Sequence, residues 1–83
     1  MTKAHEQSAD SIAAWLQVWV GNALSQSPES VDTTANFDQL GLDSLAILTA
    51  TGELAEWLDI ELEAAVLFQH STIDSLAQHL GSF

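Results

Sequence analysis

The sequence predicts an all-α fold: a small four-helix bundle of three longer helices and a short third helix, with a long ordered loop between the first two helices. Apolar residues recur at separations of three and four along three segments, as in amphipathic helices. Of the 83 residues, 47% are apolar, which supplies a core. The chain has no cysteine, so neither disulfides nor thiolate metal sites are available, and packed helices must hold the fold together.

The N-terminal end is expected to be a flexible tail over residues 1–9, followed by one folded domain over residues 10–81. The tail is polar and lacks the apolar run of a signal peptide, and no segment approaches the ~18 apolar residues of a membrane span. A cytoplasmic protein is therefore predicted. Asp10 or Ser11 is expected to cap the first helix. The apolar positions of this helix are Ile12, Trp15, Leu16, Trp19, Val20, Ala23 and Leu24.

The helical pattern stops over residues 25–43. Four apolar residues in this stretch are spaced too irregularly for a helix or a strand, and a loop of this length without structure is uncommon in a compact domain. We expect these side chains to pin the loop across the open end of the helical core, with at most a short turn near Phe37–Leu40. They are Val31, Phe37, Leu40 and Leu42.

The second helix is predicted to begin at Ser44 and to run to about Leu58. Asp59 is expected to end it, because Asp tolerates left-handed geometry better than most residues. Glu53 and Glu56 are expected to point outward. The inner face is expected to consist of Leu45, Leu48, Thr51, Leu54, Ala55 and Leu58.

A short third helix around Ala64–Phe68 and a last helix over Ile73–Leu80 complete the bundle. Thr72 is expected to cap the last helix and Gly81 to stop it. The inward positions of the last helix are predicted to be Ile73, Leu76, Ala77 and Leu80.

The net charge of the chain restricts the classes of molecule that it is expected to bind. Twelve Asp and Glu face one Lys and no Arg, which gives a formal net charge of −11. Such a surface repels phosphate backbones, so nucleic-acid binding is not expected, and anionic membranes are disfavoured too. Its long-range field favours partners with basic patches. The alternative is that acidity only keeps the protein soluble and monomeric, and a monomer is expected in either case.

The tetrapeptide DSLA occurs twice, at Asp43–Ala46 and at Asp74–Ala77. In the second copy, Ser75 follows the expected Thr72 cap by three residues. Its hydroxyl is therefore expected to bond back to the preceding turn or to lie on the helix surface. This copy needs no functional explanation.

Ser44, in the first copy, lies where the loop meets the second helix. Gly41 frees the backbone just before the junction, while Leu42 and Leu45 are expected to anchor it on either side. The Ser44 side chain would then project into solvent at the positive end of the helix, where free N–H groups would stabilise a phosphate ester on its oxygen. The simpler alternative is that Asp43 and Ser44 only cap the helix.

A catalytic role for Ser44 is disfavoured. A nucleophilic serine needs an adjacent base and an oxyanion site, and the surrounding sequence is not a Gly-x-Ser-x-Gly elbow. The three histidines, His5, His70 and His79, have no pattern that suggests a catalytic or a metal site. If Ser44 is chemically special, another enzyme must modify it.

The segment FDQLGLDSL resembles the phosphopantetheine attachment motif of acyl carrier proteins. The ending LFQHSTIDSLAQHL is similar to the last third of polyketide-synthase carrier domains. With the first helix, the resemblance covers roughly residues 10–80. Between the two segments it continues without a gap through Leu54, Ile60, Leu62, Ala64, Phe68, His70 and Thr72.

The resemblance implies a non-catalytic carrier. A phosphopantetheinyl transferase would move 4′-phosphopantetheine from coenzyme A onto the Ser44 hydroxyl, with magnesium bound at the transferase. The arm ends in a thiol that holds acyl groups as thioesters, so the reactive sulfur arrives with the cofactor. By the same resemblance, Asp43 helps to present Ser44, and Leu42 and Leu45 flank the arm. The other implied partners are an acyltransferase or ligase, a ketosynthase and further synthase enzymes with basic docking patches.

The second helix would be the main docking surface, and here the chain departs from one branch of the family. Fatty-acid carriers often place acidic residues soon after the serine, where this chain has Ala46 and Thr49. Its acids on this helix, Glu53 and Glu56, lie further from the arm, and Asp38 in the loop is another candidate for recognition. The departure favours polyketide or related specialised synthesis over fatty acid biosynthesis. A discrete carrier acting in trans is expected.

Two alternatives stay open. One is a peptidyl or aminoacyl carrier loaded by an adenylating ligase. Asp43 before the serine argues mildly against it, because peptidyl carriers often have His or Asp at that position after a Gly-Gly pair. The other is a carrier-like domain that is never modified and acts only through its acidic surface. An intact Ser44 motif counts against the second alternative.

Overall fold

Every regular element is helical in the computed structural model, which describes residues 8–81. Within that range, extended pairing is limited to one isolated bridge between Asn36 and Thr72. The predicted all-α bundle is therefore confirmed. The elements are α1 (Ala9–Leu24), the 3₁₀ turn η2 (Pro28–Ser30), α2 (Phe37–Leu40), α3 (Ser44–Leu58), α4 (Ala64–Gln69) and α5 (Ile73–Gly81).

The helix boundaries follow their capping residues. The bounds of α3 are those predicted, and Asp59 ends it in the left-handed conformation, with φ 56°. Thr72 caps α5 as predicted, because its Oγ1 accepts a hydrogen bond from the Ser75 N–H at 3.0 Å. The predicted cap of α1 was wrong: the hydroxyl of Ser8, rather than Asp10 or Ser11, accepts the Ser11 N–H at 3.1 Å. The expected tail lies outside the described residues except for residues 8 and 9.

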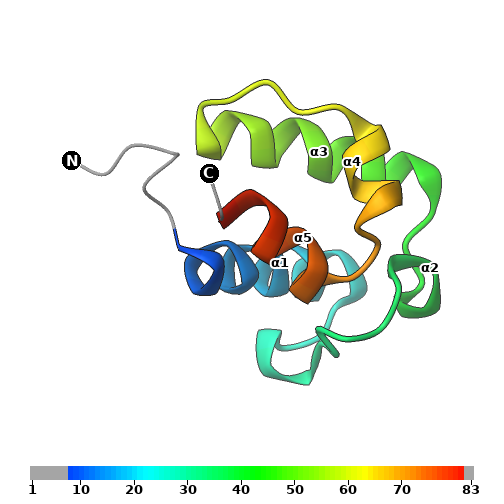
Figure 1. Cartoon of the computed structure of the whole chain (residues 1–83). Coiled ribbons are helices and arrows are strands. Elements are labelled where there is room, and N and C mark those ends of the chain that lie inside the picture. Colours follow the sequence, from blue (N-terminus) through cyan, green and yellow to red (C-terminus); the bar gives the residue numbers. More distant parts are fainter. Residues whose placement is uncertain (1–7, 82–83) are drawn as a thin grey trace.

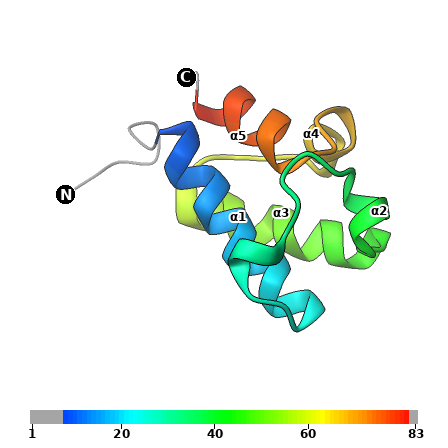
Figure 2. The ribbon, with the colours of Figure 1, turned by 90° about the horizontal axis from the view of Figure 1, so that it is seen from below.

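The helices pack around one apolar core, and Figures 1 and 2 show how they are arranged. α1 packs most closely against α5, while α3 crosses above this pair and runs broadly opposite to α1. The short α4 bridges the side of the bundle between α3 and α5 (Figure 1). The ends of the described chain meet: a Cβ at Gly81 would lie 2.7 Å from the Ala9 backbone nitrogen, so a side chain there would force the two helices apart.

The core draws on every α-helix and on the loop. The predicted inner face of α5 is confirmed, and Val31, Phe37 and Leu42 are buried as expected for a pinned loop. Within the described residues, no helix is long and apolar enough to cross a membrane. The buried apolar residues are Ile12, Leu16, Val20, Val31, Phe37, Leu42, Ile47, Ala50, Leu54, Leu58, Leu67, Ile73, Leu76, Ala77 and Leu80.

The predicted inner face of α3 was partly wrong. Leu45 and Leu48 are 71% and 54% exposed, whereas Ile47 and Ala50 are buried with Leu54 and Leu58. α3 therefore carries two apolar stripes, and the bundle buries the one that contains Ile47. Ala23 of α1 was also expected to be apolar packing but is exposed.

Hydrogen bonds tie the long loop to the start of α5. The Phe37 N–H donates to the Ser71 carbonyl at 2.8 Å, and the Asp74 N–H donates to the Thr33 carbonyl at 3.1 Å. The Ser71 hydroxyl adds a bond to the Asn36 side-chain oxygen at 2.9 Å. The loop is therefore held in place by the start of the last helix, which also fixes the position of α2 and of the residues that follow it.

Candidate functional site

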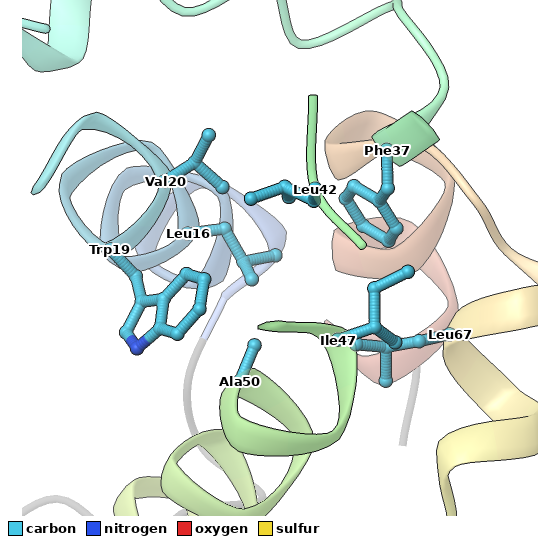
Figure 3. Close-up of a pocket in the computed structure, with 8 residues that line it drawn as sticks. All are labelled: Leu16, Trp19, Val20, Phe37, Leu42, Ile47, Ala50 and Leu67. Carbon is cyan, nitrogen blue, oxygen red and sulfur yellow. The ribbon is translucent and has the colours of Figure 1, made fainter. Parts of the chain in front are cut away.

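A tight turn after α2 sets the start of α3. The Leu42 N–H donates to the Phe37 carbonyl at 3.0 Å and the Gly41 N–H donates to the Asp38 carbonyl at 3.1 Å, the paired bonds of a Schellman motif. Gly41 adopts φ 100°, a left-handed conformation that costs glycine little. The apolar contact that accompanies such motifs joins Leu42 and Phe37, which face each other in the core (Figure 3).

Asp43 caps α3 and leaves Ser44 as the first helical residue. The Asp43 Oδ1 accepts the Ala46 N–H at 2.8 Å, and the Asp43 carbonyl accepts the Ile47 N–H at 3.0 Å. Asp43 and Ser44 are both exposed. Among residues 8–81, no side chain or backbone group forms a hydrogen bond with the Ser44 hydroxyl. The cap function therefore falls to Asp43, and the Ser44 oxygen stays available for chemistry.

The electrostatics at Ser44 suit an anion. The first N–H groups of a helix have no intrahelical acceptor, and the helix dipole adds partial positive charge at that end. In α3 the capping carboxylate accepts the Ala46 N–H, and the N–H groups of Ser44 and Leu45 remain directed along the start of the helix. A phosphate ester on the Ser44 oxygen would lie beside these donors, which is a favourable arrangement.

The surface beside Ser44 is apolar. Leu45 is one of the most exposed large apolar residues of the described chain, and Leu48 on α3 and Phe68 on α4 are each 54% exposed. A groove of about 360 Å³ lies between α2, the first turns of α3, and α4. Apolar walls and polar groups at the rim fit a ligand with both kinds of surface. The groove is lined by Asn36, Phe37, Asp38, Ile47, Leu67, Phe68 and Ser71.

Leu42 takes a different place from Leu45, although both were expected to flank an attached arm. Leu42 is only 7% exposed and points into the core against Val20 and Phe37 (Figure 3). It lines an apolar cavity of about 10 Å³, which has room for roughly one water-sized sphere. Leu42 therefore supports the turn from beneath, and Leu45 alone presents its side chain to solvent beside Ser44.

The second DSLA copy is built into the α4–α5 junction. The Ser75 N–H donates to Thr72 Oγ1, and the Ser75 hydroxyl lies 3.1 Å from the His70 Nδ1. The His70 and His79 rings stack with centroids 4.1 Å apart. As expected, Ser75 has a structural explanation, although its hydroxyl partner is a histidine side chain rather than the preceding turn. In the described part of the chain, no three His, Asp or Glu side chains are grouped to hold a metal ion.

Of the five residues predicted to recognise partners, four lie on α3 and the fifth, Asp38, lies on α2. Asp38 and Thr49 are exposed, and Ala46 is half-buried. Glu56 is exposed, and so is Glu53, but Glu53 is already engaged: its Oε1 accepts the Trp19 indole N–H at 3.1 Å. Glu53 therefore joins α3 to α1 as well as contributing charge.

Two features beside the site were missed from the sequence. Leu48 was assigned to the core, and Phe68 was given no face on its short helix, yet both are exposed. Leu48 lies one turn after Ser44 on α3, and Phe68 lines the groove between α2 and α4. The sequence did contain a signal for Leu48. The apolar residues at positions 45, 47, 48, 50 and 54 are too widely spread around the helix to share one face, which indicates a second, outward-facing stripe.

Known proteins resemble this chain along most of its length. A family model described as a phosphopantetheine attachment site matches residues 9–80. The polyketide synthase ThaG of Burkholderia thailandensis is 33% identical over 79 residues, which cover 95% of this chain. The chain spans 1% of the length of that synthase.

Two solved structures share the fold. An acyl carrier protein from Anabaena sp. PCC 7120, described as having a variant phosphopantetheinylation-site sequence, superposes with a TM-score of 0.86 at 33% identity, covering 90% of this chain and 85% of that one. A free-standing peptidyl carrier protein from Acinetobacter baumannii superposes with a TM-score of 0.84 at 31% identity, covering 90% and 94%.

Proposed function

Because the chain belongs to the phosphopantetheine attachment-site family, we propose that it is an acyl carrier that holds its cargo as a thioester on a 4′-phosphopantetheine arm joined to Ser44. The observation that carries the proposal is the contrast between its two DSLA serines. Ser44 is exposed at a helix N-terminus with an unengaged hydroxyl, whereas the Ser75 hydroxyl is held by His70. The proposed carrier unit is residues 10–81.

The residues around Ser44 fit the attached group. When bound, the arm supplies a thiol, which a chain without cysteine lacks. The N-terminus of α3 would stabilise the negative phosphodiester, and Asp43 would hold the first turn in place while helping to present Ser44 to the transferase and its magnesium. Leu45 and the groove between α2 and α4 offer apolar surface to the arm.

The chain is proposed to catalyse nothing itself. Its partners would be a phosphopantetheinyl transferase, an acyltransferase or ligase, a ketosynthase and other synthase enzymes that carry basic patches, since opposite charge speeds encounter. Asp38, Ala46, Thr49 and Glu56 are proposed to contact these partners, and Glu53 to do so while bonded to Trp19. The relatives favour polyketide or related specialised synthesis.

The first test is the mass of the intact protein after incubation with coenzyme A, magnesium and a broad-specificity phosphopantetheinyl transferase. Wild type and Ser75→Ala are expected to gain one phosphopantetheinyl group, and Ser44→Ala none. The Ser75→Ala variant is the matched control, because it removes a hydroxyl from the same tetrapeptide. Absence of any gain would instead support the unmodified, acidic interaction domain.

A peptidyl carrier is the second candidate, and the 31% identity to the Acinetobacter peptidyl carrier favours it. The two candidates share the arm and differ in cargo. Intact-mass analysis of the protein isolated from its own host would separate them. A nitrogen-free acyl group on the arm would support the acyl carrier, whereas an aminoacyl group would replace that conclusion with a peptidyl carrier.

A further inference from the structure

Three tryptophans and a glutamate line the seam between α1 and α3. Trp15 and Trp57 stack with ring centroids 5.4 Å apart and planes inclined by 14°. One turn further along α1 and one turn back along α3, the Trp19 indole N–H donates to Glu53 Oε1 at 3.1 Å. We call these four residues the tryptophan seam. It lies in the C-terminal half of α3, away from Ser44.

Part of the tryptophan seam is open to solvent. Trp57 is 37% exposed and Glu53 is exposed, while Trp15 and Trp19 are half-buried. Trp57 follows Glu53 by four residues on α3, so both side chains lie on the same side of that helix. In Figure 3 the Trp19 nitrogen points away from the apolar cavity, and its hydrogen bond to Glu53 places it at the seam. The seam therefore combines exposed aromatic area with a carboxylate.

That combination attracts cations. The face of an indole ring is the best aromatic partner for an ammonium or guanidinium group, and a neighbouring carboxylate adds a charged hydrogen-bond acceptor. Residues 8–81 contain neither Lys nor Arg, so this part of the chain cannot supply such a cation itself. Arginine suits the surface better than lysine, because its planar guanidinium can stack on a ring and pair with a carboxylate at the same time.

We propose that the tryptophan seam is a docking site for an arginine-bearing segment of a partner protein. The guanidinium group stacks on the exposed indole of Trp57 and pairs with Glu53. A second copy of this chain is a poor occupant, because its net charge of −11 opposes association and its residues 8–81 offer no arginine.

The tryptophan seam lies far enough from Ser44 that a partner bound there does not cover the serine. Trp57 lies thirteen residues after Ser44 on one helix, about 20 Å along its axis. A segment bound at the seam leaves the Ser44 end uncovered, so it can retain the carrier without blocking the arm. This last role rests on the proposed function of Ser44, whereas binding at the seam does not.

The test follows the three tryptophan indole N–H signals of the ¹⁵N-labelled full chain by NMR. The probe is an acetylated, amidated peptide of alternating arginine and alanine, and matched peptides replace arginine with lysine or with uncharged citrulline. Saturable shifts of the Trp57 and Trp15 indole signals are expected with the arginine peptide, weaker binding with lysine and none with citrulline. Shifts spread over the acidic surface with the indoles unmoved would overturn the proposal.

Variants separate the seam from general acidity. Glu53→Gln removes the charge but keeps an oxygen for the Trp19 N–H, and it is expected to weaken arginine-peptide binding about three- to fivefold, as is Trp57→Leu. Glu29→Gln on η2 and Phe68→Leu on α4 are the matched controls, one an exposed acid and one an exposed aromatic residue, and should leave binding unchanged. Equal weakening by Glu29→Gln would contradict a specific site.

Two further measurements complete the test. Indole shifts that depend on protein concentration without peptide would identify a second copy as the occupant and overturn the proposal. Phosphopantetheinylation of the same variants is followed by mass in parallel. Loading without peptide binding would overturn the docking site alone, whereas peptide binding without loading would overturn only the function proposed for Ser44.

Discussion

The tetrapeptide DSLA lies at two helix N-termini, Asp43–Ala46 and Asp74–Ala77, in two different registers. In the first copy the aspartate itself is the cap, so the leucine is the second helical residue. In the second copy Thr72 is the cap, and the leucine is the fourth helical residue. Two residues turn a helix by about 200°, so the same side chain points to opposite sides.

The difference shows that position relative to the cap, rather than local sequence, decides what each side chain does. Leu45 is 71% exposed and Leu76 is fully buried. Ser44 has an unengaged hydroxyl, whereas the Ser75 hydroxyl lies against His70. The first copy leaves its serine and leucine exposed on the surface, whereas the second copy buries its leucine and alanine in the core.

The leucines give the largest expected contrast. Leu76→Ala should lower the free energy of unfolding by about 3 kcal/mol, because it removes a fully buried side chain and leaves a cavity. Leu45→Ala should change it by less than about 0.5 kcal/mol, since its side chain is already in water. Urea unfolding followed by circular dichroism measures both. Similar losses would mean that Leu45 is buried in solution.

The aspartates give the next contrast. Asp43→Ala should cost about 1 kcal/mol of unfolding free energy through loss of the α3 cap, and Asp74→Ala only a few tenths, because Asp74 contributes to its helix mainly through the dipole. Asp43→Ser keeps a capping oxygen and should recover most of the loss in thermal unfolding. If Asp43→Ser is stable but loads slowly with the transferase, Asp43 has a role beyond capping.

Alanine substitutions of the two serines should differ in unfolding free energy by as much as those of the two aspartates, or by less. Ser75→Ala removes the hydroxyl that lies 3.1 Å from His70 and should cost about 1 kcal/mol of unfolding free energy. Ser44→Ala removes an unengaged hydroxyl, and alanine favours helices, so stability should be unchanged or slightly higher. Chemical denaturation of both variants tests this. A clear loss for Ser44→Ala would show that its hydroxyl has an unrecognised structural partner.

The smallest expected effect is a pH-dependent change in stability at Asp32. This residue lies in the loop that is hydrogen-bonded to the start of α5. Two hydrogen bonds donated to the Asp32 carboxylate lower its pKa from the usual value of 3.8. The bond from the Thr34 hydroxyl has the larger effect, and the bond from the Thr34 N–H has the smaller one. Because the folded-state pKa is the lower one, the stabilisation is present above the unfolded-state pKa and is lost as the pH falls through the folded-state pKa.

Asp32→Asn should therefore reduce stability slightly at neutral pH, and the difference from wild type should vanish at strongly acidic pH. Melting temperatures of the two proteins measured across the acid range give the comparison. Asp10→Asn on α1 is the control for removing one negative charge elsewhere. A difference that persists unchanged into acid would show that the Asp32 carboxylate is not the cause.

Much of the fold could be predicted because it depends on local chemistry. Asp43 and Thr72 mark helix starts by capping, and Asp59 marks a helix end by left-handed geometry. The inner face of α5 follows from apolar residues spaced three and four apart, namely Ile73, Leu76, Ala77 and Leu80. The loop was recognisable as ordered because Val31, Phe37 and Leu42 had to be buried somewhere. The position of Ser44 at the start of a helix followed from the same signals.

The four main helices, the Thr72 cap and the exposed serine of the candidate site could thus be predicted from the sequence alone, because each depends on residues within a turn or two of one another. The tertiary structure decided which stripe of α3 is buried, which partner holds Ser75, and that Glu53 bonds to Trp19 and Trp57 stacks on Trp15. Residues 34 and 42 positions apart leave no periodic signal in the chain. Only the packing of α1 against α3 brings them within reach of each other.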